Sequence, residues 1–337
     1  FLKDKVDKLI SGGHCKPDEI GYFSFTVKAA EEIRDRVTKE EWSEAELKKM
    51  FPYFCTLHSL AYKRLQLQQS QIMDQSDYDD LSRDTGRFFV NKMKKGNGMD
   101  ISMPTAKSEY QDLINLAYAK FPDDDDRLNQ IFRTVKLSDY GARNTIEQMD
   151  LDLKNFKRDR DKLEYVDYFN HFLKKKNPPP LKYLFVDEAQ DLSAHQWQVI
   201  NMIQEVAKPI ETYVAGDDDQ AIFRWAGADI EHFIAMAKDD ANTIIPLTQS
   251  YRIPKSVHTI ATKLAQSISR RIDKSYKPRD EEGERKVLNI RPLNKGLAEG
   301  EWLILCRTHE IVQQVSESLE QFGWLYKRYG QSVVNLK

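Results

Sequence analysis

A continuous apolar run at residues 183–186 (YLFV) leads directly into two acidic residues, Asp187 and Glu188. A strand whose consecutive residues are all apolar is buried on both faces, as is typical of central strands in a parallel sheet covered by helices. In such sheets, ligands bind at the carboxyl ends of the strands. The run therefore predicts an α/β fold with a functional site beside Asp187.

Strands and helices are predicted to alternate on both sides of this run. Short apolar runs predict strands, and apolar residues at helical spacing predict helices between them. This alternation indicates a doubly wound parallel sheet. The predicted strands cover residues 20–25, 183–186, 212–215, 243–247 and 302–306.

The region between residues 63 and 179 differs in character from its flanks. It is rich in Lys, Asp and Gln, has few β-branched runs, and carries apolar residues at helical spacing at 109–120 and 151–173. Three consecutive prolines, 178–180, form a stiff connector after it. We therefore predict a helical subdomain at 63–179, inserted into a first α/β domain formed by 1–62 and 180–246. A second α/β domain is predicted to begin at 247 and to continue to 337.

Composition limits where a binding site can lie. The 337 residues carry a net charge of only −2, so a nucleic acid would have to bind a local basic or aromatic groove. The three cysteines, Cys15, Cys55 and Cys306, are widely spaced and odd in number, which indicates reduced thiols in a cytoplasmic protein. No apolar run approaches the ~20 residues that a membrane span requires. We expect no membrane partner.

The strongest chemical signal is the segment 184–191 (LFVDEAQD). Asp187 follows the predicted strand, where a carboxylate can hold Mg²⁺ beside the phosphates of a nucleotide. Glu188 can orient or deprotonate an attacking water. The alternative is a strand that ends in an acidic turn without function.

A second signal is the segment 214–228 (VAGDDDQAIFRWAGA). The amide of Gln220 both donates and accepts hydrogen bonds, which suits it to sense a γ-phosphate or its attacking water. Phe223 and Trp225 are aromatic residues in a polar loop, where a nucleic-acid base can stack. The alternative is that both aromatic side chains are buried beneath the loop.

A third signal is the segment 247–254 (LTQSYRIP). Arg252 follows a predicted strand, and its guanidinium could neutralise charge that develops on a transferred phosphoryl group. Tyr251 could stack on an adenine ring. In isolation, the segment is also compatible with a surface arginine beside a packed tyrosine.

Together these segments resemble the superfamily-one DNA helicases of the UvrD, Rep and PcrA type. The resemblance spans nearly the whole chain and is carried by ordered motifs: FSFTVKAAEEIRDRV, TLHSLA, VDEAQD, AGDDDQAIFRWAGA, LTQSYR and WLILCRT. It implies a RecA-like P-loop NTPase sheet and a partial second RecA-like domain. It also implies ATP and Mg²⁺ as cofactors, with single-stranded DNA and duplex junctions as partners.

The resemblance further implies a role for each matched residue. Asp187 would ligate Mg²⁺ and Glu188 would be the catalytic base. Gln220 would couple the γ-phosphate to DNA, Arg252 would be the arginine finger, and Tyr251 would stack on the base of ATP. The residues implied to contact single-stranded DNA are Phe25, Thr26, Lys28, Thr56, His58, Phe223 and Trp225. If the resemblance is set aside, the sequence predicts that Thr26 is a helix cap and that His58 is a polar residue near a packed segment.

The sequence departs from the family pattern in three ways. Val27 stands where the first motif usually has Asn, and Ala226 stands where the aromatic loop usually has Arg. No G-x-x-x-x-G-K-[ST] loop occurs among the 337 residues. We expect that loop just before Phe1 and the late motifs beyond Lys337, so residues 1–337 alone should bind ATP poorly and unwind nothing.

The resemblance implies 3′ to 5′ movement on single-stranded DNA in repair, replication or recombination. Two alternatives stay open at the level of sequence. One is the motor of a helicase-nuclease. The other is a non-hydrolysing DNA-binding or scaffold protein that has lost its phosphate loop.

Overall fold

The structure, a computed structural model, describes residues 1–37, 42–91, 108–285 and 302–327. The chain divides into two compact units. Phe1–Ile245 and Ile268–Lys274 form the first, and Pro246–Ser267 and Ser275–Lys337 form the second. The first unit holds the sheet and most of the predicted site residues.

A four-stranded parallel sheet with the strand order β2-β1-β3-β4 organises the first unit. Strand β1 is buried along its whole length and β3 is buried up to its last residue. This burial confirms the predicted α/β fold with a sheet covered on both faces. The strands are β1 (Ile20–Ser24), β2 (Phe54–Cys55), β3 (Tyr183–Asp187) and β4 (Glu211–Val214).

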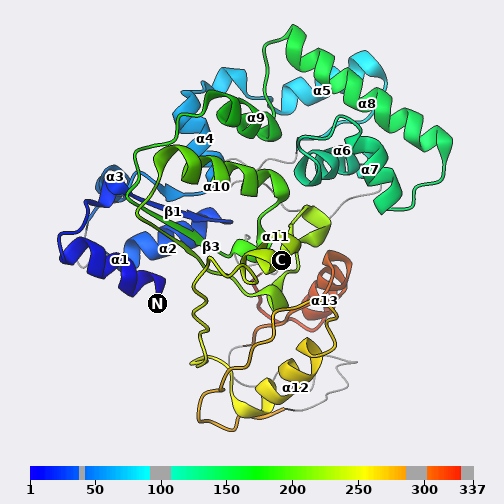
Figure 1. Ribbon diagram of the computed structural model, residues 1–337. Coiled ribbons are helices and arrows are strands. Elements are labelled where there is room, and N and C mark those ends of the chain that lie inside the picture. The colour runs from blue at the N-terminus through cyan, green and yellow to red at the C-terminus, as the bar shows by residue number, and fades with distance from the viewer. Residues whose placement is uncertain (38–41, 92–107, 286–301, 328–337) are drawn as a thin grey trace. The chain divides into compact units, whose positions relative to one another are not determined.

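Side chains along each strand alternate between two hydrophobic cores, one on each face of the sheet. Phe23, Leu184 and Val186 lie in one core, and Tyr22 and Phe185 lie in the other. Figure 1 shows β1 and β3 between the two helix layers. The first core includes α4 (Leu57–Leu65), α9 (Tyr165–Lys175) and α10 (Ala194–Ala207), and the second includes residues of α1 (Leu2–Ser11), α2 (Val27–Val37) and α3 (Glu44–Met50).

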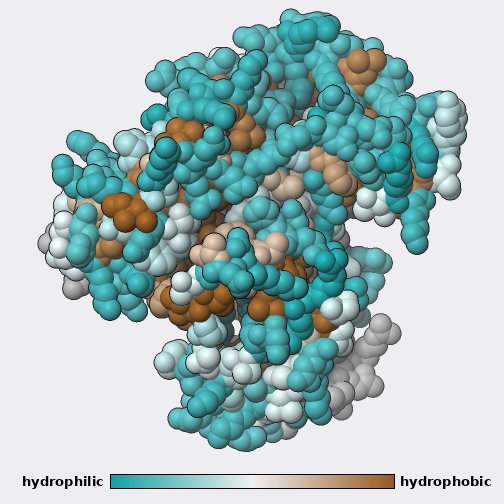
Figure 2. All heavy atoms as spheres, viewed as in Figure 1, coloured by the Kyte–Doolittle hydropathy of each residue, from teal (hydrophilic) through white to brown (hydrophobic). Residues whose placement is uncertain are grey.

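A third core lies among helices that precede α9. Its buried members include Leu81, Ile114, Phe132 and Leu153. Hydrophilic residues cover most of the visible outer face over these helices, as expected for amphipathic helices (Figure 2). The helices are α5 (Gln75–Thr85), α6 (Glu109–Lys120), α7 (Arg127–Thr134) and α8 (Tyr140–Asp159). The boundaries 63–179 of an inserted subdomain stay a prediction. Helix α9 packs mainly in the core of the sheet, and its Val166 also packs against this third core.

Side-chain caps fix where several of these helices begin. Ser193 accepts a hydrogen bond from the backbone N–H of Gln196, whose side chain in turn accepts from the N–H of Ser193. This reciprocal pair satisfies two donors that the first turn of α10 would otherwise leave unpaired. The cap therefore fixes how the chain turns from the acidic loop after β3 into α10.

The second unit contains two described helices, α12 (Lys255–Ala265) and α13 (His309–Gln321). The predicted strands at 243–247 and 302–306 do not form, so these two predictions were wrong. A strand requires a partner for its backbone hydrogen bonds, and no strand pairs with either segment among the described residues. Their large apolar side chains are accordingly exposed: Ile244, Ile245, Leu247, Trp302, Leu303 and Leu305. That residues 247–337 form a partial second RecA-like domain stays a prediction.

Three further short elements follow β4, the first of which is the 3-10 turn Asp218–Gln220. The 3-10 turn Arg224–Ala226 is followed by α11 (Ile230–Met236). No helix within the described part of the chain is both long enough and apolar enough to cross a membrane.

Candidate nucleotide and nucleic-acid sites

Asp187 lies at the carboxyl end of β3, where the sequence places it, and both of its oxygens accept hydrogen bonds. The phenol of Tyr22 on β1 donates to Oδ2 at 2.6 Å, and the backbone N–H of Glu188 donates to Oδ1 at 3.0 Å. Asp187 is half-buried. Carboxylate oxygens at this position are ligands that Mg²⁺ prefers. Asp187 can thus offer one carboxylate ligand of the kind that suits Mg²⁺, and its assignment to the ion stays a prediction.

Glu188 adopts a left-handed backbone conformation, with φ 53° and ψ 42°. Such a conformation is unfavourable for a residue with a Cβ and is found at functional sites where the surroundings impose it. Here it turns the chain sharply after the strand. The Glu188 side chain is exposed, and its Oε2 accepts a 2.8 Å hydrogen bond from Nε2 of Gln190.

Gln190 joins the two acidic motifs. Its side chain is buried, and while Nε2 donates to Glu188, Oε1 accepts a 3.0 Å hydrogen bond from the backbone N–H of Asp217. Gly216 makes this approach feasible, because a Cβ added there would lie 2.7 Å from Oε1 of Gln190. The loops after β3 and β4 are thereby held together at the carboxyl edge of the sheet.

Asp191 is a buried carboxyl group in this loop. Burial, followed by the negative charge of Glu188, raises the pKa of Asp191 to about 7. Its Oδ1 has no hydrogen-bond partner among the described residues. Perturbed carboxyl groups of this kind concentrate at functional sites.

The acidic residues after β4 form ion pairs and hydrogen bonds that the sequence did not predict. Asp219 accepts two 2.8 Å hydrogen bonds from Arg271, and this arginine holds the pKa of Asp219 below its usual value. Asp218 accepts from the backbone N–H of Ile272 at 2.6 Å and pairs with Lys274. Gln220, predicted to sense the γ-phosphate, is exposed and donates to Asp217. The acidic run therefore anchors the segment 268–274.

Three aromatic residues from two distant motifs form a row. The rings of Phe25 and Phe223 lie 5.3 Å apart, and those of Phe223 and Trp225 lie 6.3 Å apart. Trp225 is 38% exposed and Phe223 is half-buried, so neither aromatic side chain of the loop is fully covered. The structure thus brings together three of the predicted DNA-contacting residues.

The remaining predicted DNA contacts of the first motif, Thr26 and Lys28, follow Phe25 in the chain. Thr26 is exposed, and its Oγ1 accepts a hydrogen bond from the N–H of Ala29 at 3.2 Å, which caps α2. Lys28, two residues further, is exposed in the first turn of that helix. Thr26 therefore serves as a helix cap, the role that its sequence position alone favoured.

Thr56 and His58 lie away from the surface. Thr56 is buried and caps α4 by accepting from the N–H of Ser59 at 3.2 Å. The ring of His58 is buried against Tyr165 and Phe169, with centroid distances of 3.9 and 4.0 Å. Burial, followed by the nearby His195, lowers the pKa of His58 well below its usual value. These environments favour packing roles, and DNA contact by either side chain stays a prediction.

Arg252 and Tyr251 belong to the second unit. Both are exposed, Tyr251 to 86%, and the backbone N–H of Arg252 donates to Oγ of Ser250 at 3.3 Å. Tyr251 is therefore not a packed side chain. Their assignment to the nucleotide stays a prediction.

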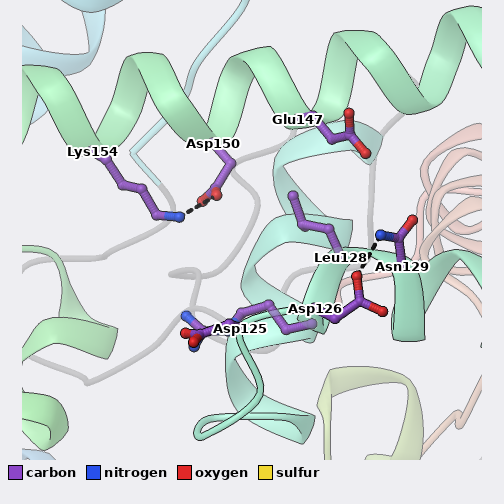
Figure 3. Close-up of a pocket in the computed structure, with 8 residues that line it drawn as sticks. Asp125, Asp126, Leu128, Asn129, Glu147, Asp150 and Lys154 are labelled. Carbon is purple, nitrogen blue, oxygen red and sulfur yellow. Dashed lines mark hydrogen bonds and ion pairs between the residues drawn. The ribbon is translucent and has the colours of Figure 1, made fainter.

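A pocket of about 240 Å³ is lined by residues of α7, of the loop before it and of α8. Figure 3 shows Lys154 paired with Asp150, at 2.7 Å, and Asn129 donating to Asp126 at 2.5 Å. Tyr118 also donates to Asp150. No group of three metal-ligating side chains is found in the described residues. Internal partners thus satisfy much of the pocket's polar lining.

Residues 1–241 of this chain match a known protein family. The family model of the UvrD/REP helicase N-terminal domain matches residues 1–241. The chain belongs to the UvrD/REP helicase family. The matched range contains the whole parallel sheet, both acidic loops and the aromatic row of this family member.

Individual relatives within the UvrD/REP family are more distant. The chain is 26% identical over 298 residues to the ATP-dependent DNA helicase PcrA of Staphylococcus aureus, an alignment that covers 84% of this chain and 38% of the relative. It is 25% identical over 284 residues to PcrA of Staphylococcus epidermidis, covering 80% of this chain and 36% of the relative. The chain thus spans well under half the length of these relatives.

Several contributors to this UvrD/REP site were not predicted from the sequence. Tyr22 reads as a core residue because it lies in an apolar strand. Gln190 lies inside a recognised motif, but its bond to the second motif depends on the fold. Arg271 and Lys274 carry no local signal, since their acidic partners lie more than fifty residues earlier in the chain.

Proposed function

We propose that this chain is the motor part of a DNA helicase, in which ATP hydrolysis drives movement along single-stranded DNA. One observation carries the proposal. The loop that bears Asp187 and Glu188 is hydrogen-bonded, through Gln190, to the loop that leads into the aromatic row. A carboxylate site suited to nucleotide chemistry is thus physically connected to a surface suited to base stacking.

The carboxylates of the first unit would act on the nucleotide. Asp187 would hold Mg²⁺, with Tyr22 and the N–H of Glu188 fixing the orientation of its carboxylate. The ion would offset the negative charge of the phosphates. Glu188 would position and deprotonate the attacking water, since its carboxylate is exposed and oriented by Gln190. Arg252 and Tyr251 would contribute from the second unit, by resemblance to the family.

The aromatic row would bind the single strand. Trp225 is exposed and would stack on a base, with Phe223 and Phe25 supporting it from behind. Base stacking on an aromatic ring contributes ~1–3 kcal/mol per base and tolerates any sequence. Lys28 and Thr26 would lie along the same path. Movement from 3′ to 5′, action at duplex junctions and a role in repair, replication or recombination belong to the same proposal.

A hydrolysis assay tests this proposal. Steady-state ATP hydrolysis by the whole protein would be measured with and without oligo(dT). The Glu188→Gln variant would be compared with Glu205→Gln, an exposed residue on α10. We expect stimulation by DNA, and a loss of kcat by a factor of roughly 10²–10⁴ in Glu188→Gln alone. Its affinity for oligo(dT) should be retained.

Two results would count against the proposal. If Glu188→Gln hydrolysed ATP as fast as Glu205→Gln, Glu188 would not be the base. If oligo(dT) bound but no hydrolysis were measurable in the whole protein, the chain would be a DNA-binding protein without a motor.

A further inference from the structure

The carboxyl end of α6 packs directly against the loop that carries the aromatic row. Gly227 follows that loop's 3-10 turn with φ +101°, and a Cβ added to it would lie only 2.8 Å from Cβ of Ala119 on α6. Ser193, at the start of α10, bridges to Ala228 on the other side. Lys120, the next and last residue of α6, therefore lies where this helix packs against the 3-10 turn that contains Arg224.

Lys120 and Arg224 are two positively charged residues on elements that pack against each other. Burial, followed by the positive charge of Arg224, lowers the pKa of Lys120. Within the described residues, neither side chain forms a salt bridge or a hydrogen bond. Asp229 is the one carboxylate that favours the charged lysine, but its Oδ1 accepts from the N–H of His232 to cap α11.

Like charges repel each other, and an anion bound between Lys120 and Arg224 would offset that repulsion. The exposed Trp225 follows Arg224 directly in the same 3-10 turn. A strand whose base stacks on Trp225 brings its own phosphates to within one nucleotide of that ring. The anion that this pair would meet is therefore a backbone phosphate.

We propose that Lys120 and Arg224 form a phosphate-binding pair for the single strand that stacks on Trp225. The inference rests on the proposed function and extends it, because Lys120 belongs to a helix of the third core and to none of the recognised motifs. The helical region thereby contributes a DNA contact of its own. Arg224 has the fixed fork geometry that suits phosphate, and Lys120 adds a point charge.

Salt dependence of DNA binding tests the pair. The affinity of the full-length chain for fluorescent oligo(dT) would be measured by anisotropy across a series of NaCl concentrations. For single strands, each neutralised phosphate contributes ~0.7 to the slope of log K against log salt. We expect Lys120→Gln to reduce that slope by ~0.7 and to weaken binding several-fold at low salt. Lys120→Arg should preserve the slope.

A matched variant controls for overall charge. Lys174→Gln removes an exposed lysine from the last turn of α9 and should leave both slope and affinity unchanged. The Tm of Lys120→Gln should not fall, because the variant removes a repulsion with Arg224. A weakening of binding could then not be ascribed to unfolding.

The outcomes separate the inference from the function on which it rests. If the wild-type chain binds oligo(dT) and Trp225→Ala weakens it, but Lys120→Gln behaves like Lys174→Gln, the phosphate pair is refuted and the aromatic site stands. If neither Trp225→Ala nor Lys120→Gln changes binding, both fail.

Discussion

The phenol of Tyr22 donates a 2.6 Å hydrogen bond to Oδ2 of Asp187, a residue 165 positions later in the chain. The two strands are neighbours in the sheet, and Ser24 is paired with Asp187 in register. Burial and the charge of Asp187 raise the pKa of Tyr22 well above its usual value, so the phenol keeps its proton and acts as the donor. The orientation of the proposed magnesium ligand is thus fixed by a core residue.

Replacing Tyr22 with Phe removes this donor without changing the ring. Hydrogen bonds to charged groups contribute ~1.5–3 kcal/mol, so we expect the free energy of unfolding to fall by about 1–2 kcal/mol at neutral pH. Urea denaturation would measure the change. Tyr213→Phe is the control, since the Tyr213 hydroxyl donates to the exposed Glu211. Equal losses in the two variants would argue against a special role for the buried bond.

Truncation of Trp225 to Ala should weaken the binding of single-stranded DNA. One lost base stack of ~1–3 kcal/mol corresponds to a decrease in affinity of roughly 5- to 150-fold. Trp42→Ala is the comparison, because Trp42 is similarly exposed but belongs to none of the motifs. Fluorescence anisotropy with oligo(dT) measures both. Unchanged affinity in Trp225→Ala would remove the aromatic row from the proposed binding surface.

Substitution of Gly216 by Ala should separate the two acidic loops. The new Cβ would lie 2.7 Å from Oε1 of Gln190 and 3.0 Å from the ring of Phe233, so Gln190 must move. Overpacking of this kind costs about 1–3 kcal/mol, and we expect ATP hydrolysis by the whole protein to fall as well. Gly141→Ala, with its nearest contact at 3.3 Å, should be harmless. A Gly216→Ala variant with normal hydrolysis would contradict a coupling role for Gln190.

Asp218→Asn should release the segment 268–274 from the loop after β4. Asp218 is buried and holds both the N–H of Ile272 and the ammonium of Lys274. An amide keeps one acceptor but loses the charge. We expect backbone amide exchange in 268–274 to become faster in this variant, as measured by mass spectrometry. The exposed Asp240→Asn should leave exchange unchanged, and protection retained in Asp218→Asn would contradict the anchor.

Stability should depend on pH through His195. Burial lowers the pKa of His195 to about 4, whereas an unfolded histidine titrates near 6.5. Between these values the unfolded chain binds the proton and the folded chain does not, so stability is lost as pH falls. The free energy of unfolding should decrease by at most about 1.4 kcal/mol per pH unit on this account. His195→Gln should make the profile less steep between about pH 6.5 and 4, with the buried His58 still contributing, and the exposed His14→Gln should not change it.

The sequence predicted the fold of the first unit well because its signals are local. Runs such as 183–186 are apolar at every position, and a strand buries all of these side chains only when both of its faces are covered. The same logic failed at 243–247 and 302–306, where apolar runs meet no strand partner among the described residues and stay exposed. Apolar composition favours a strand, but hydrogen-bonded neighbours decide whether it forms.

Some features of the candidate site were also predictable from the sequence, and others depended on the fold. Sequence by itself determined that Asp187, Glu188 and Gln220 follow strand ends and that Trp225 lies in a polar loop, because motif residues are fixed by position along the chain. Only the tertiary structure decided that Tyr22 orients Asp187, that Gln190 joins the two loops, and that the end of α6 packs against the turn that contains Arg224. These relationships depend on which strands and helices become neighbours, and contacts between segments far apart in the chain leave no local pattern to read.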